Sequence, residues 1–185
     1  MIITVSGPHG TGKSTYAAHL AKELGLRHVS AGLLFRKLAK EGHLSLEDFG
    51  QLALKDPAID RQIDEETMRE AEKGGVVVDG QLAGWVLKEV ADLCIFLFAP
   101  ESVRMERIAK RDSITVEEAW KETLRRESVQ SKRYMQHYGF KVEDRSIYHL
   151  VIDTSLFSKE DTAKVLLTAA LAVLARKEGK HSKKP

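Results

Sequence analysis

Short apolar runs alternate with longer helical patterns along the whole chain. The runs cover residues 2–6, 27–30, 75–79, 93–98 and 150–154. Because these runs are apolar on both faces, they are typical of strands buried in a parallel sheet. The stretches between them repeat apolar positions at helical spacing, and Ser45 and Thr115 each stand where a helix N-cap is expected. The pattern predicts an α/β protein, a three-layer α/β/α fold around a five-stranded parallel sheet.

Two polar helical segments interrupt this alternation, at about residues 42–74 and 112–144. Neither segment is needed to connect one strand to the next. Segments of this length at the carboxyl edge of an α/β sheet usually carry function, so we expect two helical covers that shield a reaction from water. The alternative is helical decoration without function. Residues 1–176, with both segments included, are predicted to form one domain, followed by a disordered basic tail at 177–185.

A complete phosphate-binding loop, or P-loop, follows the first apolar run. The motif G-x-x-x-x-G-K-S is formed by Gly7, Pro8, His9, Gly10, Thr11, Gly12, Lys13 and Ser14, and Thr15 continues it into a helical stretch. In this context the loop amides and the helix N-terminus bind the phosphates of a nucleotide. The motif predicts a P-loop NTPase fold that binds ATP and Mg²⁺, with Lys13 between the β- and γ-phosphates and the Ser14 hydroxyl on the metal.

Charge and composition narrow the possible partners. The net charge is +2, but residues 176–185 carry five basic side chains and one acidic side chain, a net +4, so residues 1–175 carry −2. A nearly neutral body lacks the basic face that nucleic-acid binding requires, so no nucleic-acid partner is expected. The single cysteine, Cys94, lies in an apolar run and is expected in the core. Asparagine is absent and 30% of residues are charged, which favours a thermophilic source.

No stretch of about twenty apolar residues occurs, and Met1 leads directly into the first apolar run. We therefore expect a cytoplasmic protein without a membrane partner. We further expect it to be a monomer.

Several later motifs carry a resemblance to a known family. They are residues 29–36 (VSAGLLFR), 76–85 (VVVDGQLAGW), 103–111 (VRMERIAKR), 131–134 (SKRY) and 148–155 (YHLVIDTS). In this order after the P-loop, they resemble the nucleoside monophosphate kinases, and more closely the archaeal cytidylate kinases. The resemblance runs from residue 1 to about 175. It implies Mg²⁺-dependent transfer of the ATP γ-phosphoryl group to CMP, with dCMP and UMP as further acceptors.

The resemblance also implies roles for individual residues. Arg36 is expected to bind the acceptor phosphate, and Asp79 to hold a magnesium-bound water. The other substrate-binding positions are Ser30, Gly80, Gln81 and Asp153. Two positions depart from the family pattern: Leu33 replaces an acidic residue, and Gln81 replaces an arginine. Two of these residues have structural alternatives. Asp79 could be a turn residue before Gly80, and Asp153 could cap the turn at residues 155–158.

Phosphoryl transfer to a monophosphate requires positive charge rather than a general base. The acceptor phosphate has a second pKa of about 6 and is already a dianion at neutral pH. Arginines occur at helical spacing in two groups, and the catalytic candidates among them are Arg107, Arg111, Arg125 and Arg133. The alternative is solvated surface charge balanced by neighbouring glutamates.

Other functions remain open at this stage. Within the kinases, an adenylate or dephospho-coenzyme A kinase is the first alternative. A GTP-dependent switch would need an N-K-x-D motif, which a chain without asparagine lacks. An RNA-associated ATPase is disfavoured by the nearly neutral body.

Overall fold

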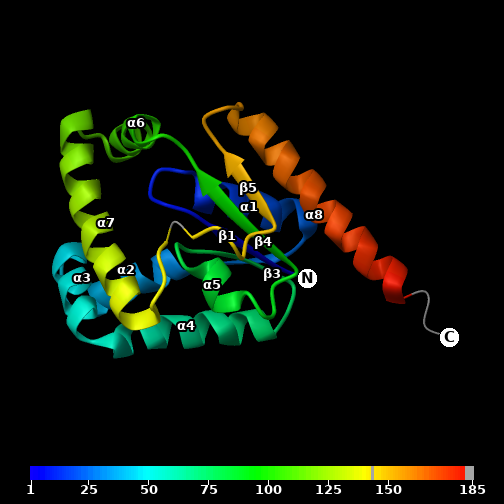
Figure 1. Cartoon of the computed structure of the whole chain (residues 1–185), viewed down its shortest axis with the longest axis horizontal. Coiled ribbons are helices and arrows are strands. Elements are labelled where there is room, and N and C mark those ends of the chain that lie inside the picture. Colours follow the sequence, from blue (N-terminus) through cyan, green and yellow to red (C-terminus); the bar gives the residue numbers. More distant parts are fainter. Residues whose placement is uncertain (143, 182–185) are drawn as a thin grey trace.

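The computed structural model describes residues 1–142 and 144–181 and contains the predicted sheet. Five parallel strands lie in the order β2-β3-β1-β4-β5 (Figure 1). Their bounds are β1 Ile2–Ser6, β2 Arg27–Ser30, β3 Val76–Asp79, β4 Leu93–Phe98 and β5 Leu150–Asp153. The five-stranded parallel sheet and the α/β fold class are thus confirmed, with β3 and β5 each one residue shorter than the apolar pattern indicated.

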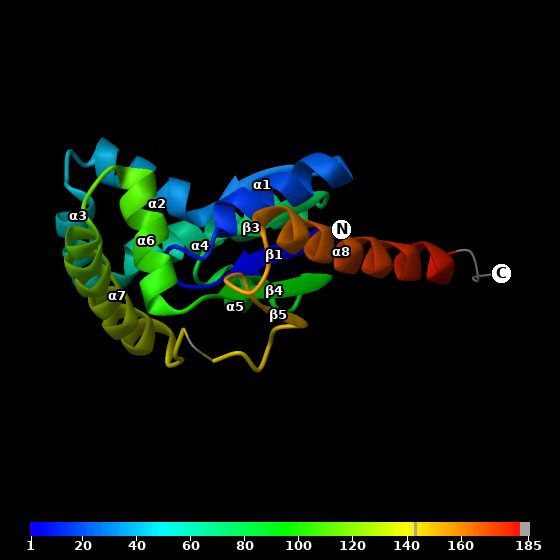
Figure 2. The same ribbon diagram turned by 90° about the horizontal axis from the view of Figure 1, so that it is seen from above.

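Helices cover both faces of the sheet. On one face, α1 (Lys13–Leu24) and α8 (Lys159–His181) pack on β1 and β4 through a core that includes Ile3, Leu20 and Leu166. On the other face, α4 (Pro57–Glu72) and α5 (Ala83–Leu87) pack on β3 through Ala71 and Leu87. Figure 1 shows α8 above the strands and α4 and α5 below them, and Figure 2 looks onto the face that α1 and α8 cover. These layers fully bury β3, which lies between β2 and β1. Polar side chains can therefore reach a ligand only beyond its carboxyl end.

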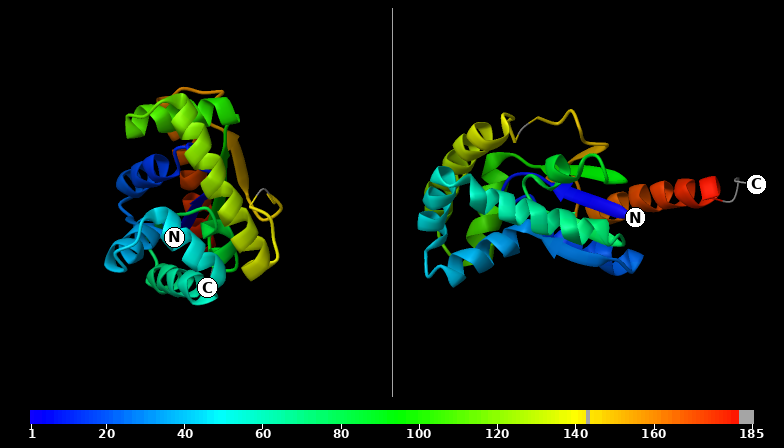
Figure 3. Two further views of the ribbon diagram at one scale, coloured as in Figure 1. Left: turned by 90° about the vertical axis from the view of Figure 1, so that its left-hand side faces the viewer. Right: turned by 90° about the horizontal axis from the view of Figure 1, so that it is seen from below.

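The remaining helices gather beyond the carboxyl ends of the strands (Figure 1). They are α2 (Ala31–Glu41), α3 (Leu46–Lys55), α6 (Glu101–Asp112) and α7 (Val116–Tyr138). The long helix α7 packs against both α6 and α3, and Figure 3 shows it spanning this end of the molecule. The first polar segment contains α3 and α4, and the second contains α7, so the two segments meet over the P-loop edge of the sheet.

Local signals account for where the cover helices begin. The Ser45 hydroxyl accepts a hydrogen bond from the backbone N–H of Asp48 at 3.0 Å and starts α3. Thr115 and Glu118 form a reciprocal capping box at the start of α7, in which each side chain accepts from the other residue's backbone N–H. Such caps satisfy amides that have no partner within the helix, so both helices begin where the sequence predicted.

The predicted disordered tail needs a correction over residues 177–181. Helix α8 continues to His181, and the Lys177 ammonium lies 2.5 Å from the Asp92 carboxylate. Asp92 also accepts a hydrogen bond from the backbone N–H of Ile2, so the pair joins α8 to the start of β1. The ion pair joins two residues that are 85 positions apart, so no local sequence pattern predicts it. It lies in the helical segment that was expected to be disordered. Residues 182–185 lie outside the described part of the chain.

Candidate active site

The P-loop wraps tightly between β1 and α1, in a conformation that depends on glycine. Gly12 caps α1 in the left-handed region at φ 87°, and a Cβ at this position would lie 2.8 Å from the Tyr16 ring. At Gly7 the φ is 141°, and a Cβ would lie 2.0 Å from the backbone oxygen of Leu97. Side chains at these positions would close the cradle or push it away from the sheet. The loop therefore presents its amides and the N-terminus of α1 to an anion.

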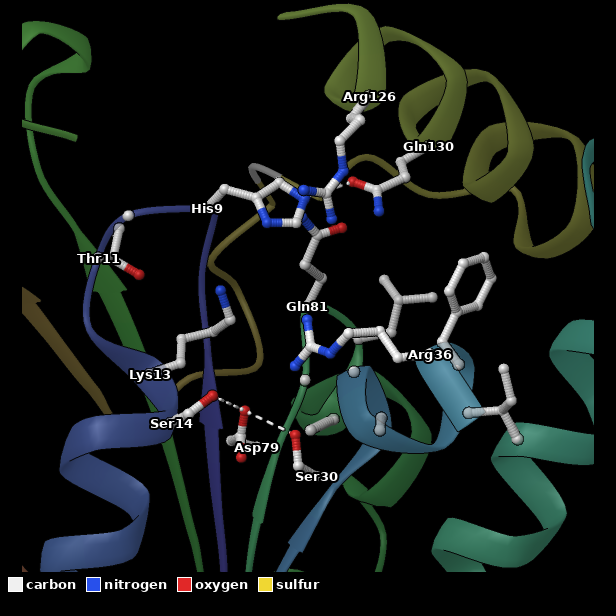
Figure 4. A pocket seen from close by; sticks show the side chains of 18 of the residues that line it. His9, Thr11, Lys13, Ser14, Ser30, Arg36, Asp79, Gln81, Arg126 and Gln130 are labelled. Atoms are coloured by element: carbon white, nitrogen blue, oxygen red, sulfur yellow. Dashed lines mark hydrogen bonds between the residues drawn. The ribbon is translucent and has the colours of Figure 1, made fainter. Parts of the chain in front are cut away.

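Lys13, Ser14 and Asp79 lie together at the floor of the site (Figure 4). The Ser14 hydroxyl donates a hydrogen bond to Asp79 Oδ2 at 2.8 Å, although the two residues are 65 positions apart. Lys13 Nζ donates to the backbone oxygen of Pro8 at 2.8 Å, and burial lowers the pKa of Lys13 from 10.5 to about 8. This hydroxyl and carboxylate are hard oxygen donors of the kind that Mg²⁺ takes beside phosphate oxygens and water. The residues present thus fit a magnesium ion.

Asp79 has further partners that hold its carboxylate in place. It is 2% exposed, and it contacts the His28 ring at 2.7 Å and the Ser30 hydroxyl at 3.3 Å. Ser30 also caps α2 by accepting from the backbone N–H of Leu33 at 3.4 Å. This network fixes the carboxylate at the end of β3, whereas a turn residue would need none of these distant partners.

A cavity of about 550 Å³ extends from the P-loop toward α4 and α7. It is large enough for nucleotide-sized ligands. Most of the predicted site residues line it: His9, Gly10, Thr11, Gly12, Lys13, Ser14, Thr15, Ser30, Arg36, Asp79, Gly80, Gln81, Arg107, Arg111 and Arg133. Gly7 and Pro8 lie in the loop behind this surface, and Thr11 donates to the Pro8 oxygen at 2.9 Å.

Cations from three helices point into the same space. Figure 4 shows Lys13 on α1, Arg36 on α2 and Arg126 on α7 directed toward one another across the cavity. Burial, followed by the charges of Arg36 and Arg111, lowers the pKa of Arg126. Positive charges at close range repel one another, and Asp112 and Glu122 offset this repulsion only in part at Arg126. An anion bound in the cavity would therefore stabilise the arrangement.

The helix α6 arginines diverge in their contacts. Arg107 donates to the Thr154 hydroxyl at 2.8 Å and to its backbone oxygen at 2.7 Å, which joins α6 to the end of β5. Arg111 pairs with the neighbouring Asp112 at 2.6 Å, and this pairing raises the pKa of Arg111. Both guanidinium groups still line the cavity.

Three predicted site residues have their contacts elsewhere. Arg125 pairs with Glu47 on α3 and lines an adjoining cavity of about 490 Å³, while the next residue, Arg126, faces the P-loop. Arg133 lies 3.2 Å from Asp60, deep between α7 and α4. The Asp153 carboxylate accepts from the backbone N–H of Ser155 at 2.8 Å and its hydroxyl at 2.6 Å, which matches the turn-capping alternative. Arg125 and Arg126 are neighbours on α7, and only Arg126 faces the P-loop. Helical spacing alone does not predict which of the two does so.

Glu127 is a contact of the P-loop that sequence reasoning missed. Its Oε1 accepts from the backbone N–H of His9 at 3.2 Å and from the buried Arg104 at 2.7 Å, and Arg104 in turn donates to the His9 oxygen at 2.9 Å. Beside it, Gln130 contacts the His9 ring at 3.0 Å. Burial, with Lys13 nearby, holds the pKa of His9 well below its ordinary value. Helix α7 is therefore held to the P-loop by hydrogen bonds. In the sequence, the i, i+3 spacing of Glu127 and Gln130 indicates that both side chains lie on one face of α7.

Comparison with known proteins agrees with this geometry. The model of the cytidylate kinase-like family matches residues 2–156. The chain belongs to that family. It is 46% identical to a cytidylate kinase from Aeropyrum pernix, over 90% of this chain and 96% of the relative. It is also 46% identical to a cytidylate kinase from Pyrococcus horikoshii, over 91% of this chain and 88% of the relative.

Solved structures extend the likeness at the level of the fold. A shikimate kinase from Acinetobacter baumannii superposes with a TM-score of 0.58 at 17% identity, over 92% of this chain and 93% of that one. The Thermus thermophilus protein TT1252 has a TM-score of 0.60 at 19% identity, over 93% of this chain and 96% of that one. Within the described residues, we find no helix of sufficient length and hydrophobicity to span a membrane.

Proposed function

We propose that the protein is a cytidylate kinase that transfers the γ-phosphoryl group of ATP to CMP and yields ADP and CDP. The observation that carries the proposal is the convergence of Lys13, Arg36 and Arg126 on the space above the contact between Ser14 and Asp79. The P-loop amides supply a site for the donor phosphates beside that space. The resemblance to cytidylate kinases over 90% of the chain supports CMP as the acceptor.

The residues divide into donor and acceptor sides. The loop amides and Lys13 would hold the β- and γ-phosphates, with the Ser14 hydroxyl as a ligand of Mg²⁺ and Asp79 orienting a water on the metal. When bound, the metal neutralises charge on the donor phosphates. Arg36 extends from α2, opposite Lys13, so it is placed to receive the acceptor phosphate. Two anions held in line between these groups need positioning and charge more than they need proton transfer.

The environment of Asp79 also argues against a hydroxyl acceptor. Transfer to a hydroxyl group needs a carboxylate that is free to accept a proton, but Asp79 is already engaged by Ser14, His28 and Ser30. Leu33 stands where the family pattern has an acidic residue, so it supplies no base at this position, and it is 58% exposed. A phosphate dianion needs no such base.

A panel of acceptors tests the proposal. ADP release from ATP and Mg²⁺ is measured with CMP, dCMP, UMP, AMP, GMP and shikimate, each at several concentrations. We expect the highest kcat/KM with CMP, lower values with UMP and dCMP, and background with purine monophosphates and shikimate. A faster reaction with AMP would instead support an adenylate kinase, and ADP release independent of any acceptor would support an ATPase.

A further inference from the structure

A cluster of charged and phenolic side chains joins α4 to α7 beside the cavity. Its members are Asp60 and Asp64 from α4 and Arg133, His137 and Tyr138 from α7. All of them except His137 line the cavity. Charged groups are rarely buried unless they are paired or bind a ligand. The burial of this cluster therefore needs an explanation, either in its own ion pairs or in a ligand.

Arg133 is the most deeply buried cation in the cluster, at 2% exposure. Its Nη2 donates to the Tyr134 hydroxyl at 3.2 Å, and its guanidinium carbon lies 5.0 Å from the centre of the Phe35 ring. Nε lies 3.2 Å from Asp60 Oδ2 as an ion pair, but neither Nε nor Nη1 makes a hydrogen bond within the described part of the chain. Two buried N–H groups without acceptors are costly, and an acceptor entering the cavity would relieve that cost.

Asp64 supplies the complementary group one helical turn from Asp60. Its Oδ2 accepts a hydrogen bond from the Tyr138 hydroxyl at 2.6 Å. Burial raises the pKa of Asp64 from 3.8 to about 6, and the negative charge of Asp60 also contributes. A carboxylate in this environment gains from a further hydrogen-bond donor, and its position on the cavity wall makes it accessible to a ligand.

The two aspartates do not have the same task. Asp60 Oδ2 already lies within 3.2 Å of Arg133 and 3.0 Å of the His137 ring. Asp60 therefore holds Arg133 and the His137 ring of α7 against α4. Asp64 forms no ion pair with any of the described residues, and its partner Tyr138 is a hydroxyl donor. This difference makes Asp64 the acceptor that is available to a ligand.

We infer that Arg133 and Asp64 read the base of the acceptor monophosphate as cytosine. This inference rests on the proposed function and deepens it. Arg133 donates to the ring N3 and the O2 carbonyl of cytosine, and Asp64 accepts from the exocyclic N4 amino group. Apolar side chains from α4 and α5, Ile63 and Val86, line the same cavity and suit a flat ring. Arg36 lines the same cavity, and Figure 4 shows it directed toward the P-loop, where the acceptor phosphate belongs.

Uracil mismatches both groups. Its N3 carries a hydrogen that faces the Arg133 donors, and its O4 carbonyl faces the Asp64 carboxylate. A site built to hydrogen-bond one edge rejects an analogue that leaves its buried groups unpaired or opposed. The cluster thus accounts for selection of cytosine over uracil without any contact to the phosphate.

The test replaces Asp64 by asparagine, which keeps the size of the side chain and adds an amide donor that suits the uracil O4. The matched control is Glu65→Gln, which removes one charge from the exposed neighbouring position on α4. Calorimetric titration with CMP and with UMP gives the two dissociation constants, and the ADP-release assay gives kcat/KM for each. Thermal melting verifies that each variant is folded.

We expect Asp64→Asn to reduce the preference for CMP over UMP, measured as the ratio of dissociation constants and of kcat/KM, by about tenfold or more. The KM for ATP and the behaviour of Glu65→Gln should match the wild type. Arg133→Lys is the second variant, used if Asp64→Asn does not fold. It replaces a planar fork by a point charge, and CMP affinity should fall by about tenfold while ATP affinity is unchanged.

Each contrary outcome has a distinct meaning. Equal loss of CMP and UMP affinity in Asp64→Asn, or no change in either, would overturn base reading and leave the cluster as an ion-pair network joining α4 to α7. A wild type that binds CMP no better than UMP would overturn it as well. A wild type that prefers CMP in titration yet releases no ADP would contradict the proposed function alone and leave the base-reading inference standing.

Discussion

Removal of the Lys13 ammonium tests the catalytic core of the proposal. In Lys13→Ala the P-loop keeps its glycines and amides. Within the described part of the chain, the one hydrogen bond of the lysine side chain is to the Pro8 oxygen. The charge acts on the transferring phosphoryl group, so we expect the variant to fold while kcat falls by about 100-fold or more, the usual effect of removing one preorganised electrostatic group.

The same substitution has a stability effect with a defined sign. The pKa of Lys13 is lowered from 10.5 to about 8, chiefly by burial. At about 1.36 kcal/mol per unit, the shift of about 2.5 units corresponds to at most about 3.4 kcal/mol, and partial solvent access to the side chain reduces this to about 1–2 kcal/mol. The folded state binds the proton less tightly than the unfolded chain. Wild-type stability therefore carries the full penalty below pH 8 and recovers it between pH 8 and about 10.5.

Two measurements check these expectations. Coupled ADP release with CMP gives the activity, and urea unfolding at pH 7 and at pH 10 gives the free energies of unfolding for wild type, Lys13→Ala and the control Lys40→Ala. Lys40 is an exposed lysine on α2. From pH 7 to pH 10 the wild type should gain about 1–2 kcal/mol relative to Lys13→Ala, but not relative to Lys40→Ala. Turnover above about a tenth of the wild type, or parallel stabilities at both pH values, would refute the reasoning.

Three further substitutions separate the parts of the site. Arg36→Ala should raise the KM for CMP by about 10- to 100-fold, because a charged hydrogen bond to phosphate is worth about 1.5–3 kcal/mol, and it should leave ATP affinity unchanged. If calorimetry shows equally weakened binding of CMP and ATP, Arg36 lies outside the acceptor side. Glu127→Gln should tighten ATP binding by about two- to tenfold, because it removes a negative charge beside the His9 N–H while keeping a hydrogen-bond acceptor. Weaker ATP binding would instead show that the carboxylate is needed to hold the P-loop in its binding conformation. Gln81→Arg should lower the KM for CMP by up to about tenfold, with no gain for AMP or GMP; a gain shared by purine monophosphates would remove its link to the pyrimidine.

The P-loop illustrates a site that local sequence predicts well. Its glycines, Lys13 and Ser14 are contiguous, and their geometry depends on backbone conformations that belong to these residue types. The strands were equally readable, because burial on both faces leaves an uninterrupted apolar run. Asp79 was placed at the metal side because it ends such a run, and the structure brings it to 2.8 Å from Ser14.

The arginines illustrate the limit of that approach. Helical spacing placed Arg125 and Arg133 on one face of α7, but Arg125 pairs with Glu47 on α3 and Arg133 lies beside Asp60 on α4. Which side chain points at the P-loop depends on how α7 is rotated where it packs on α3 and α6. Contacts between helices distant in the sequence set that rotation, and periodicity carries no information about them.

The sequence by itself determined the element order, the P-loop and the two helical segments that cover it, because each is encoded by neighbouring residues acting through backbone preference and local burial. Only the tertiary structure decided which charges meet. It joined Glu127 to the P-loop, extended α8 through Lys177 and Asp92, and enclosed Asp64 and Arg133 between α4 and α7. Burial of these groups depends on the packing of distant segments. It leaves Nε and Nη1 of Arg133 without hydrogen-bond acceptors in the described part of the chain, and it raises the pKa of Asp64.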